Sequence, residues 1–194
     1  FVTTCAFAQF ESTLSLLTEA LGESDQDNFL IFAYVGFILT LSQGFIVRRL
    51  STKLEPKLLA LGGTAVMIVG LLLIGFAGKN GSVTQLFIVL PIAVIGFSAV
   101  TPSLQALLSL RTAAEKQGEI LGLGQSMSAL ARIAGPVIGM RLFDKSHVEW
   151  PYWAGAAMMG VGLVLVALQR SSQRDGTAAS SDGSASADAD TSAE

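Results

Sequence analysis

The stretch LLALGGTAVMIVGLLLIGFAG, residues 58–78, contains no charged side chain and a single polar one, Thr64. Its length matches the roughly 20 residues that a helix needs to cross the hydrocarbon core of a bilayer. Other long runs with almost no charge lie at residues 1–21, 29–47, 86–110, 120–142 and 150–168. The pattern predicts an all-α membrane protein with six transmembrane helices.

The composition agrees with this prediction. Apolar residues make up 51% of the chain and charged residues only 14%, whereas a soluble domain carries about 25% charged residues. A large soluble core would also be apolar, but it would not produce six runs of this length. We therefore expect one domain, residues 1–170, with helices at about 1–21, 28–48, 56–77, 85–110, 118–142 and 150–169.

The two ends of the chain differ in character. Residues 171–194 contain no apolar residue larger than Ala. Such a segment buries too little surface to offset its ordering entropy, so we expect a disordered cytoplasmic tail. At the other end Phe1 already lies inside an apolar run, and we expect the chain to be a fragment that begins within a helix.

The distribution of Lys and Arg predicts the orientation, because cytoplasmic loops carry the excess of basic residues. The connections at 48–57 and 111–116, together with the C-terminal segment, hold eight basic residues. The opposite connections hold only Lys79 and Lys145, with Arg141 at the border. We expect a multi-pass protein of the plasma or inner membrane with both ends in the cytoplasm.

Four of the six expected helices carry polar side chains spaced three or four residues apart, which places them on one face. We interpret these four helices as surrounding a polar interior. The helices at 56–77 and 150–169 lack such a stripe and are expected to face lipid. Small and hydroxyl side chains at this spacing can also serve helix packing alone. The candidate cavity-lining residues are Gln9, Ser15, Ser98, Thr101, Gln105, Gln125 and Ser128.

Two opposite charges lie deep in the expected helices. Glu11 precedes Ala20 by nine residues, and Arg132 precedes Leu142 by ten. At about 1.5 Å per residue, both lie close to the membrane midplane. One interpretation is an ion pair that only holds two helices together. The other is that Arg132 keeps Glu11 near a titratable state, and that a proton or an anionic solute breaks the pair.

Proline and glycine mark positions of special backbone geometry. Pro91 and Pro102 are expected to kink the helix at 85–110, because each removes a backbone donor. Gly135, Pro136 and Gly139 are expected to act as packing or hinge positions. The GxxxG spacing of Gly135–Gly139, which also occurs at 118–122, permits close approach of two backbones.

No cofactor, metal or nucleic acid is expected. The single Cys5 cannot form an internal disulfide, and the single histidine, His147, lies in a connection between helices. Intramembrane proteases need a Ser–His dyad or a histidine-containing zinc site, so an enzyme is not expected. The sequence also lacks the glycine-rich phosphate-binding loop (Walker loop) of ATP-driven transporters.

Several stretches, taken in order, resemble the second half of a major facilitator superfamily transporter. GFIVRRLSTK (44–53) is similar to the second copy of the family's cytoplasmic loop signature. Gly44, Arg49 and Lys53 match it, and Arg48 stands where the signature has Asp. The stretches that look like the drug–proton antiporter branch, which includes tetracycline exporters and tetran-like members, are FAQFESTLSLL (7–17), AVTPSLQALLS (99–109), EKQGEILG (115–122) and ALARIAGPVIG (129–139).

The resemblance implies the C-terminal six-helix half of a transporter whose halves rock about a central site. The helices at 1–21 and 85–110 would line the cavity, and those at 28–48 and 118–142 would flank the missing N-terminal half. The implied function is proton-coupled efflux of a drug-like or organic-anion solute by alternating access. The implied partners are the lipid bilayer, the missing half, a small organic solute and the proton. Uptake of a small metabolite and a non-transporting receptor or scaffold remain alternatives.

The charge distribution makes a prediction about topology. If the connections at 48–57 and 111–119 are cytoplasmic, a cysteine at Thr52 or Thr112 will not react with an impermeant thiol reagent added outside intact cells. Strong labelling at either position would reverse the predicted orientation.

Overall fold

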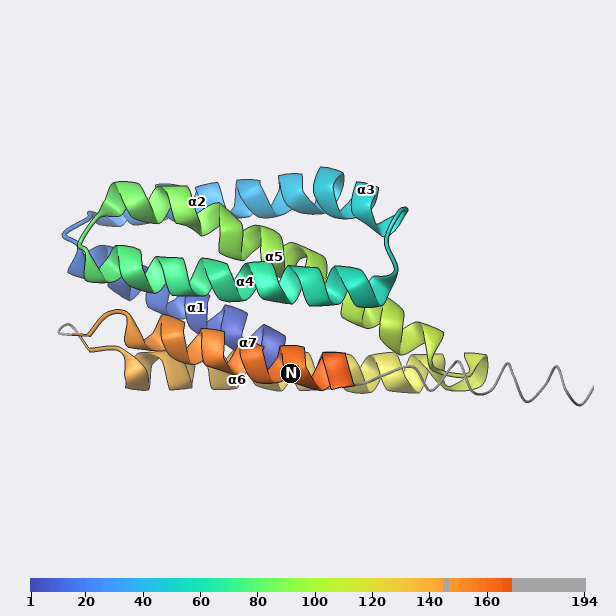
Figure 1. Cartoon of the computed structure of the whole chain (residues 1–194). Helices are drawn as coiled ribbons and strands as arrows, with labels where there is room; N and C mark the ends of the chain where they lie inside the picture. The colour runs from blue at the N-terminus through green and yellow to red at the C-terminus, as the bar shows by residue number, and fades with distance from the viewer. Residues whose placement is uncertain (145–146, 169–194) are drawn as a thin grey trace, which may run out of the picture.

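The structure, a computed structural model, describes residues 1–144 and 147–168. Over these residues the chain forms helices joined by short connections (Figure 1), which confirms the predicted all-α class. The predicted tail at 171–194 lies outside the described residues, as do Lys145 and Arg170. The elements are α1 (Val2–Ala20), α2 (Asp25–Leu41), the π-helix η1 (Ser42–Val47), α3 (Arg48–Ser51), α4 (Pro56–Lys79), α5 (Val83–Leu110), the 3₁₀-helix η2 (Ala114–Lys116), α6 (Gln117–Leu142) and α7 (Trp150–Leu168).

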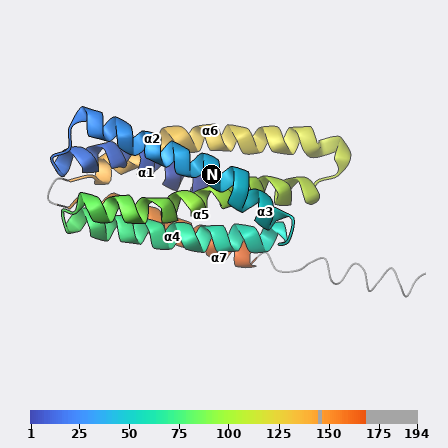
Figure 2. The same ribbon diagram turned by 90° about the horizontal axis from the view of Figure 1, so that it is seen from above.

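The long helices lie side by side in a bundle (Figures 1 and 2). Helix α4 packs mainly against α5 and α7, and α1 packs mainly against α6 and α7. Helix α2 packs against α5. Helix α5 runs obliquely across the bundle, from beside α2 to beside the first half of α6 (Figure 1). It therefore links the two sides of the bundle.

Helices α1 and α4 end in the same tight turn. Gly22 and Gly81 adopt positive φ angles of 87° and 66°, which a glycine tolerates without steric cost. In each turn two backbone N–H groups return to the last carbonyls of the helix, as the bond from Glu23 N to Thr18 O at 3.1 Å illustrates. This Schellman arrangement satisfies carbonyls that would otherwise lack partners, and it reverses the chain within a few residues.

The helix expected at 28–48 is longer in the structure. A capping box at Ser24 starts it, since the Ser24 hydroxyl accepts from Asp27 N and the Asp27 carboxylate accepts from Ser24 N, both at 3.3 Å. Such a cap satisfies two orphan groups at a helix N-terminus. The helix then continues through η1 and α3 to Ser51. Charged Asp25 and Asp27 are thereby included in its first turn.

Within residues 1–144 and 147–168, four helical segments are long and apolar enough to cross a membrane: Asp25–Ser51, Pro56–Lys79, Val83–Leu110 and Trp150–Ala167. Helices α1 and α6 are also long enough, with 19 and 26 residues, but they are more polar. Glu11 and Arg132 are part of the reason. The expectation of six membrane spans therefore stays a prediction for these two helices.

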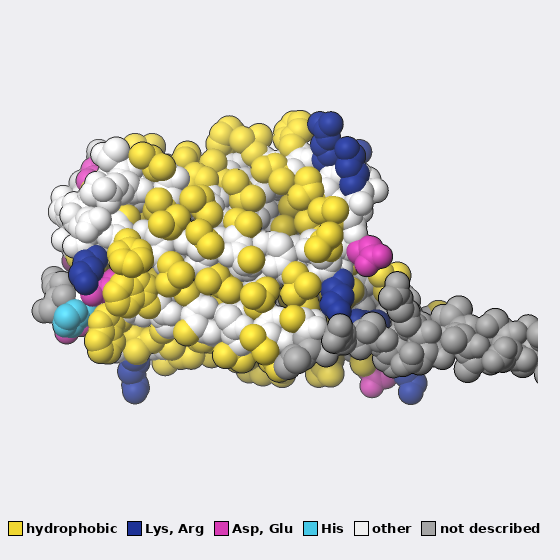
Figure 3. All heavy atoms as spheres, in the orientation of Figure 1, with side chains coloured by type: hydrophobic (Ala, Val, Ile, Leu, Met, Phe, Trp, Pro, Cys, Tyr) yellow, Lys and Arg dark blue, Asp and Glu magenta, His cyan; other side chains and the backbone are white. Residues whose placement is uncertain are grey.

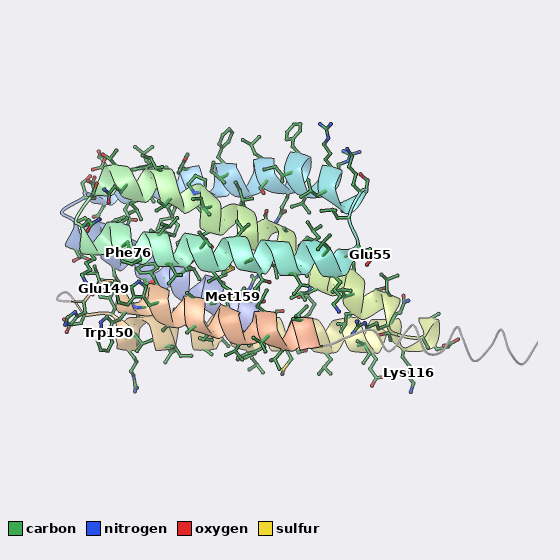
Figure 4. The ribbon with its side chains drawn as sticks, viewed as in Figure 1. Glu55, Phe76, Lys116, Glu149, Trp150 and Met159 are labelled. Carbon is green, nitrogen blue, oxygen red and sulfur yellow. The ribbon has the colours of Figure 1, made fainter. Side chains whose placement is uncertain are left out.

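The surface has the polarity expected of a protein surrounded by lipid. On the face shown in Figure 3, large apolar side chains cover the middle of the bundle and charged side chains gather toward its ends. Phe29 and Ile88, for example, are 74% and 69% exposed. Glu149 and Trp150 lie at one end, and Glu55 and Lys116 lie at the other (Figure 4).

Glycines set how closely α1 and α6 pack. A Cβ atom at Gly135 would lie 2.6 Å from the Cys5 carbonyl oxygen and 2.9 Å from the Gln9 nitrogen. One at Gly139 would lie 2.8 Å from Thr13 Cγ2. Contacts this short do not accommodate a side chain, so the two helices meet backbone to backbone. The second GxxxG pair therefore lies in the contact between α1 and α6, and the packing or hinge role expected for it stays a prediction.

Helices α4 and α5 meet in the same way. A Cβ atom at Gly70 would collide with the backbone of Ala93, and one at Gly96 would collide with the backbone of Met67. A Cβ atom at Gly63 would lie 2.9 Å from Val100 Cγ2. By contrast, a Cβ atom at Gly118 or Gly122 would meet no atom within 4 Å. The GxxxG pair at the start of α6 makes no close contact with the described residues.

The contrast between these glycines gives a matched pair of variants. Gly135→Ala should destabilise the chain by about 1–3 kcal/mol, because the new methyl group forces two backbones apart. Gly122→Ala should leave stability unchanged or raise it by up to about 1 kcal/mol, since alanine favours the helix. The midpoint of thermal unfolding in detergent micelles, followed by circular dichroism, measures both. Equal midpoints for Gly135→Ala and the parent chain would mean that the α1–α6 contact is not tight.

Candidate functional site

A cavity of about 730 Å³ opens between α5 and α6 at the end of the bundle that carries η2. The start of α1, the second half of α5, the first half of α6 and Val166 of α7 form its walls. Ligand pockets for small molecules commonly have volumes of about 300–1,000 Å³. The cavity is therefore large enough for a drug-sized solute.

Its lining is amphipathic. Thr101 and Gln105 are four residues apart on α5, and Gln125 and Ser128 are three apart on α6, so each pair shares a helix face. These four predicted cavity residues do line the described cavity. The apolar part of the wall is made by Leu104, Leu107, Leu108, Ile120, Leu121, Leu123 and Met127.

The packing of α6 explains why this space is open. Its buried residues are Ala131, Gly135 and Gly139, all in the second half. That half lies against α1, whereas the first half has no buried residue. Residues 118–128 of α6 do not pack tightly against α5, and their polar face therefore borders the cavity. Arg111, where α5 ends, supplies the charged group in the lining.

Gln9 lies elsewhere, in the contact between α1, α6 and α7. Its side chain is 1% exposed, and its Nε2 donates to the Pro151 carbonyl oxygen at 2.6 Å. Its Oε1 is buried without a hydrogen-bond partner among the described residues. The cavity prediction did not anticipate this role, because the partner of Gln9 is a backbone carbonyl far along the chain.

Ser15 and Ser98 also lie outside the described cavity. The Ser15 hydroxyl accepts from Asn28 Nδ2 at 2.7 Å and so joins α1 to α2. The Ser98 and Ser42 hydroxyls are 2.5 Å apart in a buried contact between α5 and η1. Polar side chains on neighbouring membrane helices commonly form such hydrogen bonds with one another. The structure thus gives these two serines packing partners and does not bring them to the solute-sized space.

Glu11 and Arg132 lie on adjacent, closely packed helices, and both side chains are exposed. Arg132 is near enough to act electrostatically on Glu11. Among the described residues, however, the two do not form an ion pair within 4.0 Å; the pair observed joins His147 Nδ1 to Glu149 Oε1 at 3.6 Å. The two charged side chains therefore lie on either side of the α1–α6 contact without forming a direct ion pair.

The loop-signature residues surround the end of the helix that runs from Asp25 to Ser51. Gly44 lies in the π-helix η1, and Arg48 and Arg49 form the start of α3. Lys53 follows in the connection, and all four residues are exposed. A π-helical segment within an α-helix often marks a functional position. The sequence pattern did not predict this one.

The three prolines lie inside continuous helices, Pro91 and Pro102 in α5 and Pro136 in α6. Pro91 has no N–H to donate to the Phe87 carbonyl four residues earlier. Tyr34 of α2 meets that carbonyl instead, since its hydroxyl donates to Phe87 O at 3.4 Å. The proline thus creates a bond between α2 and α5. The spacing from Phe87 to Pro91 could have identified the freed carbonyl, but not its partner.

Taken together, apolar spans, glycine-mediated helix packing and an amphipathic cavity define a helical, multi-pass membrane protein. Comparison with known proteins gives the family. Residues 1–189 match the sequence profile of the Major Facilitator Superfamily, and the chain belongs to this family. No solved structure matches the chain significantly.

Its relatives include proteins named for drug resistance. The chain is 30% identical to the class G tetracycline resistance protein of Vibrio anguillarum, over 72% of the chain and 34% of that protein. It is 28% identical to the class C protein of Escherichia coli over the same shares. Identity to multidrug resistance protein 2 of Bacillus subtilis is 25%, over 92% of the chain and 44% of the relative. The chain therefore spans less than half the length of these relatives. Relatives named for tetracycline resistance support the expected drug-efflux branch of the family, while the expectation of a C-terminal half stays a prediction.

The cavity makes a prediction about solvent access along α5. Gln105 is exposed in the cavity wall, whereas Ser98, two turns earlier, is fully buried. In detergent-solubilised chain, Gln105→Cys should react with a water-soluble thiol reagent at least about tenfold faster than Ser98→Cys, because the thiolate must be accessible. The unmodified chain, with its buried Cys5, provides the background rate. Equal rates at the two positions would contradict the described boundary of the cavity.

Proposed function

We propose that this chain is the C-terminal half of a secondary transporter that exports drug-like or organic-anion solutes. The observation that carries the proposal is the amphipathic cavity between α5 and α6, in a chain that belongs to a transporter family. Its glutamine, serine and threonine side chains offer donors and acceptors, and its leucine-rich wall suits an apolar body. Relatives named for tetracycline and multidrug resistance support a solute of this kind.

The proposed cycle is alternating access driven by a proton gradient. The solute would lie between this half and an N-terminal half, and rocking of the halves would expose it to each side in turn. The basic connections at 48–57 and 111–116 would face the cytoplasm, by the excess of positive charge. The cavity would then lie in the cytoplasmic half of the bundle, where a solute for export enters.

Glu11 is the proposed proton carrier and Arg132 its modulator. A carboxylate is the group on α1 that can take up and release a proton, and an exposed side chain can exchange it with water in the cavity between the halves. Arg132 is a positive charge on α6, the helix that packs closely against α1. Because no direct ion pair joins them, protonation of Glu11 would not require a buried bond to break.

Flux measured with the complete protein tests the proposal. In proteoliposomes with an imposed proton gradient, the parent protein should move a labelled amphipathic drug against its concentration gradient. A receptor or scaffold on the same fold would bind the drug but would not move it across the membrane. A transporter for metabolite uptake would carry its solute in the direction opposite to export.

Substitution of the two charges tests the coupling. Glu11→Gln should lower gradient-driven efflux by roughly tenfold or more while drug binding is retained, because an amide cannot carry the proton. Arg132→Ala should shift the pH dependence of efflux. Glu19→Gln is the matched control, since Glu19 is an exposed carboxylate at the end of the same helix, and it should leave efflux unchanged. Unchanged pH-dependent efflux in Glu11→Gln would eliminate the coupling role.

A further inference from the structure

A second, smaller groove lies at the end of the helix that runs from Asp25 to Ser51. Its volume is about 370 Å³, and it shares no lining residue with the larger cavity. The residues that line it are Gly44, Phe45, Arg48, Arg49 and Thr52. They come from two rows spaced four residues apart, Gly44–Arg48–Thr52 and Phe45–Arg49, which lie next to each other on the helix surface.

Glycine and the π-helix give the groove its shape. A Cβ atom at Gly44 would meet nothing within 4 Å, so the floor of the groove is open backbone. Phe45 forms an apolar wall and is 72% exposed. Both residues lie within η1, where the backbone is wider than an α-helix. The groove therefore combines an apolar side with a basic end.

The two arginines are available to a ligand. Both are exposed, and no carboxylate of the described residues lies within ion-pair distance of either guanidinium. The hydroxyls of Ser51 and Thr52 donate to the carbonyls of Arg48 and Arg49, at 3.0 and 2.9 Å. These bonds occupy two acceptors at the helix end, where free carbonyls would repel an anion.

The position along the helix indicates which ligand the groove fits. The segment Asp25–Ser51 is long and apolar enough to cross a membrane, and the arginines lie at its end. Lys and Arg side chains gather there beside the apolar surface (Figure 3). Basic pockets at this depth suit anionic lipid headgroups, and the planar guanidinium can hold a phosphate through two hydrogen bonds.

We propose that this groove binds the phosphate group of an anionic phospholipid, held by Arg48 and Arg49, with an acyl chain lying along Phe45. A free phosphate ion would use the arginines but would leave the apolar wall empty. A phospholipid fills both parts, which is why the lipid is the better occupant. The bound lipid would hold the α3 end of the helix at the membrane surface.

Native mass spectrometry of the 194-residue chain, released from detergent micelles, tests this assignment. The probes are phosphatidylglycerol and phosphatidylcholine of equal chain length, and the measured quantity is the apparent affinity for the first lipid bound. We expect phosphatidylglycerol to bind more tightly. The double variant Arg48→Gln/Arg49→Gln should weaken its binding on the order of tenfold and leave phosphatidylcholine unaffected.

Two control variants separate a specific site from general charge. Arg141→Gln removes an exposed arginine in the last turn of α6, away from the groove. This variant should retain the preference for phosphatidylglycerol. Arg48→Lys/Arg49→Lys keeps both charges but loses the paired hydrogen bonds, and it should bind with intermediate affinity. Circular dichroism establishes that each variant has the parent's helical content.

The proposal is overturned by any of three results. The parent chain could bind both lipids equally, the double glutamine variant could keep the preference, or Arg141→Gln could lose it to the same degree. Inorganic phosphate provides a further arm. If low millimolar phosphate displaces phosphatidylglycerol completely, the groove is a site for free anions and the lipid assignment is wrong.

Discussion

Close backbone contact between helices is the constraint on which the rest of the bundle depends. Lipid gives two apolar helices no hydrophobic reason to associate, so packing must come from close approach and from hydrogen bonds. Gly135 and Gly139 bring α6 onto α1, and Gly70 and Gly96 bring α4 onto α5. Because the buried residues of α6 all lie in its second half, its first half packs only loosely against α5. The cavity is thus a consequence of where the glycines lie.

Hydrogen bonds between helices complete this packing at the positions where the backbone or a side chain is polar. Pro91 frees a carbonyl in α5, and Tyr34 meets it from α2. Gln9 reaches the Pro151 carbonyl from α1, and Ser42 of η1 meets Ser98 of α5. A lone polar group in a dry interior costs free energy unless it is paired. Polar side chains in these helices therefore serve either to bond a neighbouring helix or to line the cavity. A side chain with a hydrogen-bond partner on another helix belongs to the first group.

That distinction limits what the sequence could predict. The apolar runs and the GxxxG spacing are local features. The runs were enough to predict the all-α class, and the spacing led to the expectation of a packing or hinge role for Gly135 and Gly139. Thr101, Gln105, Gln125 and Ser128 lie in the wall of the described cavity, and their contact with a solute stays a prediction. Gln9 and Ser98 look equally polar in the sequence, but each has a partner more than 50 positions away. Such a partner depends on helix arrangement, which spacing along one helix does not contain.

The stripe on α6 carries this argument one step further. Gln125, Ser128, Arg132, Gly135 and Gly139 follow one another at spacings of three or four and so share a face. Its polar first half borders the cavity, and its glycine half is fixed to α1. Arg132 lies between them, about one turn from each. If a solute displaces the first half of α6, the helix would bend or turn about its crossing with α1, and Arg132 lies between the cavity face and that crossing. Glu11 stays with α1. In the proposed cycle, the separation of these charges would therefore respond to occupancy of the cavity, which gives a physical route from solute binding to the proton carrier.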